Sequence, residues 1–552
     1  MRKIKKILFE YRWFLLFWFL INLLQAKFTN LHYDEAYYWL YSKVMSWGYF
    51  DHPPMIAASS KIGDLLSHTT LGLRIIPVII GVFVISAIIF LIDDNKNKNH
   101  VFFYIISFPL ITTHIAGFLS LPDALLCFFF VLFLIFYQKY LRGDSLILVL
   151  ALSITIACMI YSKYHAFIIL LFVLLANFKL VFKKSFWLIF SMTILLLTPH
   201  IIWQIKNDYP SFIYHLDTRA SGFSLNNLFE FIIGQIVLAG PLSGIVVIYL
   251  TIKYRVKDTF EKTLKYIAIG FYLFFIFYCI NGRVEAHWTS VSTVALIIIS
   301  YKQIKNISKI DKFFKYLIYP SIFLIFCARI VLVEDNFSEK LSLKRNFMNM
   351  DNWSNELDSI AKGTDILFTN KYQNVSIYSY SKNKLYPSAL KTGTRFSQID
   401  LFKLDSIYDG KKVFALDFGN DIFWKSKNGS EHHGSFINNY YSYTGIEIEN
   451  LSLSYSKSTV DLEFDLVNKS SKSRFLNYDE NQKLKLTCYL GSKKNEFYLF
   501  EICDKKEILS KESININVRL KDFGPAGNDR INLELSSNGL RVFNQKVSSF
   551  ID

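Results

Sequence analysis

The stretch HYDEAYYWLYSKVMSWGYFDHPPMIA, residues 32–57, lies between two apolar runs and decides how the first part of the chain is interpreted. The apolar runs cover residues 9–27 and 71–92, and each is long enough to form a helix that crosses the hydrocarbon core of a membrane. The stretch itself combines carboxylates, histidines and aromatic side chains. Its Pro53 and Pro54 exclude a regular helix at that point, because proline lacks a backbone donor and fixes φ. The pattern therefore predicts a polar connection at a membrane surface.

Further apolar runs follow along the chain up to about residue 335. They cover residues 101–119, 121–137, 145–161, 164–180, 185–204, 228–252, 265–281, 288–301 and 314–334. The whole chain of 552 residues is 52% hydrophobic and 17% aromatic, more apolar than ordinary soluble domains. We therefore predict a polytopic α-helical membrane domain over residues 1–335 with about eleven transmembrane helices.

The remaining residues have the pattern of water-exposed protein. Residues 336–435 mix helical and strand patterns, which predicts a small α/β domain. Residues 436–552 alternate apolar and polar side chains with turn signals between them, which predicts a β-sandwich. We find no catalytic cluster in this tail, and binding or assembly is its default role.

The distribution of basic residues predicts the orientation in the membrane. If the N-terminus is cytoplasmic, the inner segments carry 20 Lys or Arg and the outer connections carry six. This bias toward the inside is the one that cytoplasmic loops show. An odd number of spans then places the tail outside the cytoplasm. The basic, apolar N-terminus resembles a signal peptide, but Glu10 and Arg12 interrupt its apolar run, so we favour a retained first helix in the inner (cytoplasmic) membrane.

The charge distribution and the cysteine pattern argue against nucleic-acid binding and against a cysteine-based metal site. The formal net charge of +16 arises largely in short loops between apolar runs, so topology explains it better than nucleic-acid binding. The six cysteines form no metal-binding pattern. Cys488 and Cys503 lie in the tail and could pair in an oxidising compartment, and the sequence leaves this open.

The polar residues of the first outer connection can be interpreted as either structural or functional. Asp34 and Glu35 directly follow the first span, where a carboxylate pair is either a solvated helix-end charge or a functional group. Asp51 and His52 follow in the same connection. The aromatic residues between these pairs predict a short helix lying flat in the membrane interface, or a simple interface belt.

Other outer segments carry similar choices. Lys163 lies between two apolar runs and is either a snorkelling side chain or a phosphate contact. Arg283 and Glu285 could contact a substrate or simply pair with each other, and Asp123 could be only a helix cap. Together, however, these carboxylates and cations face one side of the membrane, where carboxylates can act as general bases and cations can neutralise a phosphate leaving group.

Several motifs resemble those of the bacterial branch of glycosyltransferase family 39. They are DEAYYW, GYFDHPP, LPDALLCFFF, YSKYH, PHIIWQ with DYPSFIYHL, and GRVEAHW, and the resemblance covers roughly residues 10–335. That family includes protein mannosyltransferases and the aminoarabinose transferase of lipid A. The resemblance implies a glycosyltransferase C-type fold and a donor sugar carried on a polyprenyl phosphate.

The resemblance also implies roles for residues of the first outer connection. Asp34 corresponds to the catalytic carboxylate, and Glu35 completes the pair. Asp51 matches an acidic position at which relatives can place a divalent metal ion. His52 stands where relatives often carry a lysine that contacts the lipid phosphate, so it could donate to a phosphate or ligate a metal ion with Asp51. Tyr37 occupies a position that is often arginine, so one phosphate or sugar contact is missing or supplied elsewhere.

We therefore expect an inverting sugar transferase on the outer face of the membrane, with Asp34 as general base. The donor phosphate is expected to meet Lys163, Arg283 and His52, and the substrate-binding residues are expected to be Asp123, Tyr37 and Glu285. No complete metal-ligand set is evident. The Lys-, Asn- and Ile-rich composition is typical of a bacterium with an AT-rich genome, and a bacterial source favours undecaprenyl over dolichyl phosphate.

The sugar is not predicted, and the acceptor could be a lipid, a glycan or a protein. The alternative is a multi-pass transporter or lipid flippase, although such proteins place charges at mid-membrane depth and this chain places few there. A sensor or adhesion protein that acts through its tail is a third interpretation, but it leaves the polar outer segments unexplained.

Overall fold

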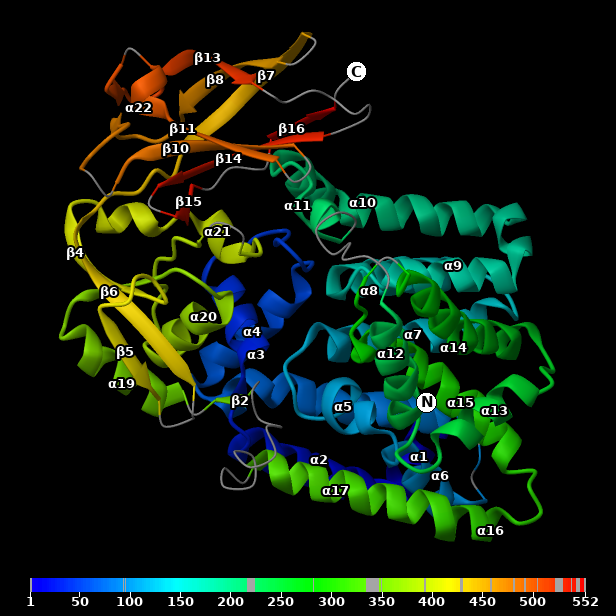
Figure 1. The fold of residues 1–552 in the computed structure, drawn as a ribbon. Helices are drawn as coiled ribbons and strands as arrows, with labels where there is room; N and C mark the ends of the chain where they lie inside the picture. Colours follow the sequence, from blue (N-terminus) through cyan, green and yellow to red (C-terminus); the bar gives the residue numbers. More distant parts are fainter. Residues whose placement is uncertain are drawn as a thin grey trace. The chain divides into compact units, whose positions relative to one another are not determined.

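The computed structural model describes residues 2–552 with gaps. The gaps are residues 93, 95, 216–223, 281, 334–346, 349, 392–393, 427–429, 457–458, 480–481, 491–492, 504, 522–529, 538, 543–546 and 551–552. The chain divides into two compact units, Met1–Met348 and Asn349–Asp552 (Figure 1). Each unit has its own buried apolar core.

The first unit is built mainly from helices (Figure 1). In chain order they are α1 (Arg2–Glu10), α2 (Arg12–Phe28), α3 (Tyr33–Lys43), α4 (Met55–Leu66), α5 (Thr70–Ile92), α6 (Lys98–Ile106), α7 (Pro122–Tyr140), α8 (Leu146–Ser162), α9 (Ala166–Ala176), α10 (Lys184–Lys206), α11 (Pro210–Ile213), α12 (Leu225–Leu238), α13 (Gly244–Lys253), α14 (Thr259–Tyr278), α15 (Ser290–Ile304), α16 (Ile310–Phe313) and α17 (Tyr319–Val333). Each apolar run of the sequence coincides with at least one of these helices.

Within the part of the chain that the structure describes, four helical stretches are long and apolar enough to cross a membrane. They are α5, α7, α10 and the continuous stretch Ile310–Val333. Two of the predicted runs are broken. Residues 101–119 divide between α6 and the π-helical turn Ile111–Ile115, and residues 228–252 divide between α12 and α13 near Gly240, whose φ is +136°. The number of about eleven crossings therefore stays a prediction.

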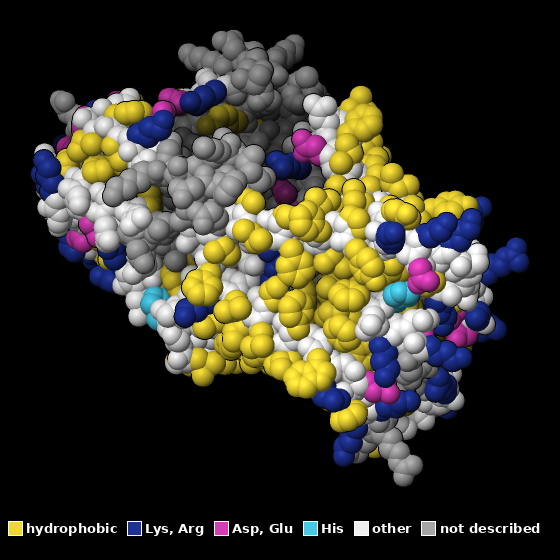
Figure 2. Space-filling model, turned by 90° about the horizontal axis from the view of Figure 1, so that it is seen from below, with side chains coloured by type: hydrophobic (Ala, Val, Ile, Leu, Met, Phe, Trp, Pro, Cys, Tyr) yellow, Lys and Arg dark blue, Asp and Glu magenta, His cyan; other side chains and the backbone are white. Residues whose placement is uncertain are grey.

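The surface of the helical unit is strongly apolar. Figure 2 shows hydrophobic side chains covering a broad face, with Lys and Arg side chains gathered toward one end. Helices α2 and α17 both expose large apolar side chains, among them Trp13 at 70% and Phe323 at 67%. Water-exposed proteins rarely present an apolar surface of this extent, whereas a lipid environment accepts it. The chain is therefore an α-helical membrane protein.

The second unit begins with an α/β part. Its four-stranded sheet has the order β3-β4-β6-β5, in which β3 and β4 are parallel and the other pairs are antiparallel. Its elements are α19 (Met350–Ala361), β3 (Asp365–Phe368), α20 (Tyr372–Ser381), α21 (Gln398–Phe402), β4 (Lys411–Leu416), β5 (Ile422–Lys425) and β6 (Glu431–Tyr440). Strand β6 runs past residue 435, where we expected the α/β part to end.

The described rest of the tail contains two larger antiparallel sheets, with the strand orders β13-β8-β7 and β11-β10-β14-β15, in which β16 also pairs with β14, and a two-stranded antiparallel sheet β12-β9. The elements are β7 (Ile446–Ser456), β8 (Thr459–Asn468), β9 (Arg474–Phe475), β10 (Leu484–Leu490), β11 (Lys493–Tyr498), α22 (Leu499–Ile502), β12 (Glu507–Ile508), β13 (Ser513–Lys521), β14 (Arg530–Ser537), β15 (Leu540–Arg541) and β16 (Val547–Phe550). Alternate residues of both sheets, such as Phe464 and Leu486, share one core, as expected for a β-sandwich. Cys488 lies in that core, and it and Cys503 are both free thiols.

Candidate functional site

Asp34 lies in the first turn of α3, directly after the short strand β1 (Leu31–His32). The turn is closed by reciprocal capping: the Asp34 N–H donates to His32 Nδ1 at 3.2 Å, and the His32 N–H donates to Glu35 Oε2 at 3.0 Å. The Asp34 side chain remains 31% exposed. A carboxylate at the start of a helix is stabilised as an anion by the helix dipole. Asp34 is therefore accessible and held in a defined place.

Glu35, the neighbour of Asp34, has different surroundings. Its buried carboxylate accepts from Arg74 Nε at 2.9 Å, Arg74 Nη2 at 2.6 Å and the Ser120 N–H at 2.7 Å. Burial alone would raise the pKa of Glu35, but the charge and hydrogen bonds of Arg74 outweigh it and lower this pKa. These contacts tie α3 to α5 and to the loop before α7, which suits a positioning role, and the catalytic role expected for Glu35 stays a prediction.

Arg74 was not selected from the sequence, where it lies inside an apolar run. Its guanidinium is fully buried and also donates to the carbonyl oxygens of Ala26 at 3.0 Å, Thr29 at 2.7 Å and Asn30 at 2.9 Å. It thereby fixes the chain between α2 and α3 that leads to Asp34. A lone arginine within a membrane run is a signal of a buried polar contact, and this signal could have identified it.

Asp51 and His52 contact tyrosines of α3. The Tyr41 hydroxyl donates to Asp51 Oδ1, and the Tyr38 hydroxyl lies 3.0 Å from His52 Nε2. Among the residues that the structure describes, no three His, Cys, Asp or Glu side chains gather as a metal-binding group. Asp51 and His52 thus form, within the described residues, an incomplete ligand set.

The aromatic residues of α3 face protein rather than lipid. Every residue from Glu35 to Ser42 is buried, and the Tyr37 ring packs against Tyr41 with a centroid separation of 4.8 Å. This burial corrects the expectation of an aromatic belt that faces lipid, whereas the expectation that the helix lies flat in the interface stays a prediction. The tyrosines instead build a packed wall behind Asp51. A substrate contact by Tyr37 stays a prediction.

Asp123 and Lys163 come together from two separate motifs. Lys163 Nζ donates to Asp123 Oδ1 at 2.8 Å and to Oδ2 at 2.9 Å, and the Ser290 hydroxyl donates to Oδ1 at 2.5 Å. Asp123 is 2% exposed and Lys163 is 4% exposed, so the lysine does not snorkel to water and the aspartate does more than cap α7. The pair joins the first turn of α7, the C-terminal end of α8 and the start of α15.

Two histidines that were not selected from the sequence lie near this pair. The rings of His114 and His287 stack with a centroid separation of 5.3 Å and an interplanar angle of 22°. Burial lowers the pKa of His287 well below its ordinary value; the charge of Asp123 opposes this shift and that of Lys163 adds to it. A histidine within the predicted apolar run 101–119 was the available signal for His114.

Arg283 and Glu285 pair with each other at the surface, as one of the two interpretations predicted. Arg283 Nε lies 3.7 Å from Glu285 Oε1, and the two side chains are 64% and 40% exposed. Burial, together with the charges of Asp34 and Glu285, raises the pKa of Tyr33 to about 12. The charges of Glu285 and Asp34 therefore both act on Tyr33.

An apolar cavity of about 580 Å³ lies among α7, α8, α9 and α10. Tyr164, the residue after Lys163, lines it together with His200 and Gln204. The Tyr164 hydroxyl donates to Ser211 at 3.0 Å and accepts from Gln204 at 2.9 Å. The rest of the lining is mostly apolar, so the cavity suits a hydrocarbon chain with a polar group near Tyr164.

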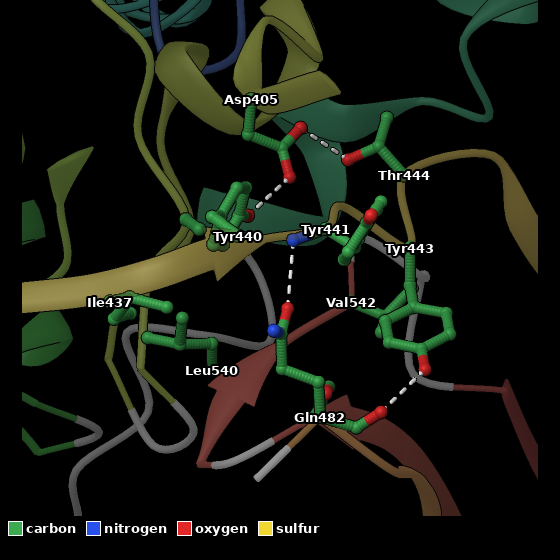
Figure 3. Close-up of a pocket in the computed structure, with 11 residues that line it drawn as sticks. Asp405, Ile437, Tyr440, Tyr441, Tyr443, Thr444, Gln482, Leu540 and Val542 are labelled. Atoms are coloured by element: carbon green, nitrogen blue, oxygen red, sulfur yellow. Dashed lines mark hydrogen bonds between the residues drawn. The ribbon is translucent and has the colours of Figure 1, made fainter. Parts of the chain in front are cut away.

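The tail has a small pocket of its own (Figure 3), with a cavity of about 30 Å³. The carboxylate of Asp405 accepts from the hydroxyls of Tyr440 at 3.0 Å, Ser442 at 2.5 Å and Thr444 at 2.6 Å. Burial raises the pKa of Asp405, and these hydrogen bonds oppose the shift. The cavity holds about one water molecule, so this cluster joins the two parts of the tail rather than binding a sugar.

The sequence and the structure were compared with those of known proteins. No family model and no curated protein matches the sequence. The crystal structure of ArnT from Cupriavidus metallidurans bound to undecaprenyl phosphate is similar, with a TM-score of 0.55 at 11% identity over 77% of this chain and 98% of that chain. The apo structure of the same ArnT gives a TM-score of 0.52 at 11% identity over 72% and 90%.

The chain has the glycosyltransferase C-type fold. The predicted fold class is thereby confirmed, and at 11% identity the likeness concerns the fold alone. The cryo-EM structure of arabinofuranosyltransferase AftD from Mycobacteria covers 98% of this chain and 62% of its own, at 8% identity and a TM-score of 0.41, too low to indicate a shared fold.

Proposed function

We propose that this protein transfers a sugar from a polyprenyl-phosphate donor to a lipid, glycan or protein acceptor on the outer face of the cytoplasmic membrane. The observations that carry the proposal concern an accessible carboxylate, Asp34, and a buried cation, Lys163. Glu35, the neighbour of Asp34, binds the Ser120 N–H just before α7, and Lys163 binds Asp123 in the first turn of α7, in a membrane fold whose apolar cavity begins at Tyr164. The occurrence of undecaprenyl phosphate in a structure of the same fold supports this donor class. The sequence motifs that resemble those of glycosyltransferase family 39 also support it.

The two parts of the donor bind in two places, the hydrocarbon tail in the apolar cavity and the phosphate in the polar cluster. Its hydrocarbon tail occupies the apolar cavity among α7 to α10, where burial of each CH₂ group favours binding by about 0.8 kcal/mol. Its phosphate lies near Lys163, with His52 and Arg283 as further contacts. The acceptor approaches from water toward Asp34, with Asp123, Tyr37 and Glu285 as substrate-binding residues.

The reaction is a single displacement at the anomeric carbon. The acceptor oxygen or nitrogen forms a bond to this carbon while the bond from the carbon to the phosphate oxygen breaks. The electron pair leaves with the phosphate, and the acceptor proton passes to Asp34. One displacement inverts the anomeric centre, and the transition state has oxocarbenium character. A positioned general base contributes about 10²- to 10⁴-fold to such a rate.

The residues around Asp34 hold this geometry. Glu35 and Arg74 fix the start of α3, which places the Asp34 carboxylate without using it for packing. A phosphate leaving group requires fixed cations more than a second acid, because its charge is stabilised electrostatically. This requirement explains why a lysine, Lys163, and not a protonated carboxyl group is proposed to contact the phosphate.

Mass comparison of cell-envelope lipids and glycans tests the proposal. Cells with the wild type are compared with cells that carry Asp34→Asn, at matched expression. The exposed Asp311→Asn on α16 is the matched control, since Asp311 is 89% exposed and distant in sequence from the cluster. A sugar missing only from the Asp34→Asn envelope, with accumulation of the undecaprenyl-phosphate sugar, identifies donor and acceptor together. Unchanged envelopes and lipid pools would contradict the proposal and favour a transporter.

A further inference from the structure

We propose that His114 and His287 form a binding site for the phosphate of the lipid donor, beside Lys163. The inference rests on the proposed function and deepens it. The two rings stack at 5.3 Å, one from the π-helical turn before α7 and the other from the turn before α15. His287 precedes Ser290 by three residues, and the Ser290 hydroxyl donates to Asp123. Both histidines also interact electrostatically with Asp123 and Lys163, so the pair lies near the contact between these two residues.

Charge balance explains why Lys163 requires help. Its ammonium contacts both oxygens of Asp123, so the pair as a whole carries no net charge. A sugar phosphodiester carries one negative charge, and the polyprenyl phosphate that leaves is a monoester that can carry two. Stabilising this extra charge needs donors beyond a neutral ion pair. His114 and His287, which interact electrostatically with Asp123, are side chains of the cluster that can supply them.

The orientation of His114 leaves one ring nitrogen for a ligand. Its Nδ1 lies 2.7 Å from the Thr113 hydroxyl, which is also 3.1 Å from the Pro109 carbonyl oxygen. Nε2 is the ring atom that remains. When the Thr113 hydroxyl donates to Nδ1, the neutral ring carries its hydrogen on Nε2 and can donate it to a phosphate oxygen.

The stack is not explained by packing alone. Another histidine of this unit, His100, stacks on Phe314 at 4.1 Å and 17°, a pairing with an apolar ring. Two phenyl rings at these positions would give the same stacking energy as two imidazoles. The imidazoles in addition place polar nitrogens beside a buried ion pair, where desolvation of a polar group is unfavourable. Polar rings at both positions therefore indicate a polar ligand.

Titration of the full-length protein in detergent with undecaprenyl phosphate tests the inference. His287→Phe keeps an aromatic ring and removes both nitrogens, and we expect its Kd to rise about 10- to 150-fold, the range for loss of a hydrogen bond to a charged group. His114→Phe is expected to act in the same way. His100→Phe is the matched control and should bind as the wild type does.

A second pair of variants separates recognition from folding. His287→Gln and His287→Met have similar length, but only glutamine can donate to a phosphate oxygen. Tighter binding by the Gln variant than by the Met variant, at equal thermal stability, supports the site. Equal binding by both would overturn it.

Two further outcomes locate any failure. If the wild type itself does not bind undecaprenyl phosphate, the proposed function fails. If the wild type binds the lipid and all histidine variants bind equally well, only the histidine site fails. Inorganic phosphate is the competitor, and competition at concentrations similar to those of the lipid would indicate a free-anion site and overturn the assignment to a lipid donor.

Discussion

Asp34 and Glu35 are adjacent in sequence but have different physical surroundings. Asp34 is accessible at the start of α3, whereas Glu35 is buried and accepts hydrogen bonds from Arg74, Ser120 and His32. The acidic pair could be identified from the sequence. The division of roles could not, because it depends on Arg74 and on Ser120, which lies 85 positions away along the chain.

Replacing Arg74 by methionine should strongly destabilise the membrane unit. Arg74→Met leaves the Glu35 charge buried without its partner, which costs about 3–5 kcal/mol. Thermal unfolding in detergent measures the effect. Lys98→Met is the matched control, because Lys98 pairs with Glu10 at 3.3 Å while 37% exposed, and an exposed pair contributes below about 1 kcal/mol. Equal loss in both variants would contradict the structural role of Arg74.

Glu35 should also make the stability of this unit sensitive to acid. Its pKa is lowered in the folded protein, so its contribution is complete above the unfolded pKa, roughly 4.3, and is lost as pH falls through the folded pKa. The stability difference between wild type and Glu35→Gln should therefore be constant from about pH 6 upward and shrink below roughly pH 4.3. Thermal midpoints from pH 3 to 7 measure it. A difference that grew on acidification would have the wrong sign.

At the scale of elements, the Asp123–Lys163 contact joins α7, α8 and α15. The sequence indicated both residues as separate motifs, but not that they touch, since nothing in local spacing relates positions 40 apart. Hydropathy likewise located the helices but not the breaks near residue 115 and at Gly240, where the chain leaves regular α-helix. Such breaks depend on tertiary packing that a hydrophobic run does not encode.

A double variant separates the structural and chemical roles of this contact. Lys163→Met alone leaves Asp123 buried and unpaired, which should cost about 3–5 kcal/mol. Adding Asp123→Asn removes the unpaired charge and should restore most of that stability without restoring transfer, because the cation is still absent. Thermal midpoints and transfer rates on the same preparations measure both. Recovery of activity in the double variant would contradict a phosphate role for Lys163.

At the scale of the whole molecule, the sequence was sufficient for the fold class. Apolar runs predicted the helical unit, alternation predicted the β-sandwich, and similarity to ArnT over 77% of the chain agrees with the fold that the motifs implied. The half-buried histidine pair and the buried Arg74 could not be predicted from the sequence. Each lies within or beside apolar sequence, where a single polar residue has no local pattern to mark its partner.

The orientation of the chain is a prediction at this scale. The excess of Lys and Arg in alternate loops predicts that residue 309 lies inside and residue 506 outside. Lys309→Cys and Lys506→Cys introduce thiols at exposed positions. In intact spheroplasts, a membrane-impermeant maleimide should label only the Lys506→Cys protein. Labelling of the Lys309→Cys protein alone would reverse the topology and place the Asp34 cluster on the cytoplasmic face.

The central claim is that Asp34 promotes sugar transfer from a polyprenyl-phosphate donor. Release of free undecaprenyl phosphate tests it most directly, measured by mass spectrometry after the purified protein is incubated in lipid vesicles made from a total envelope extract. The wild type should release the lipid phosphate with time, and Asp34→Asn should do so about 10²- to 10⁴-fold more slowly while keeping the same thermal midpoint. Equal release by both proteins, or none by the wild type, would contradict the account.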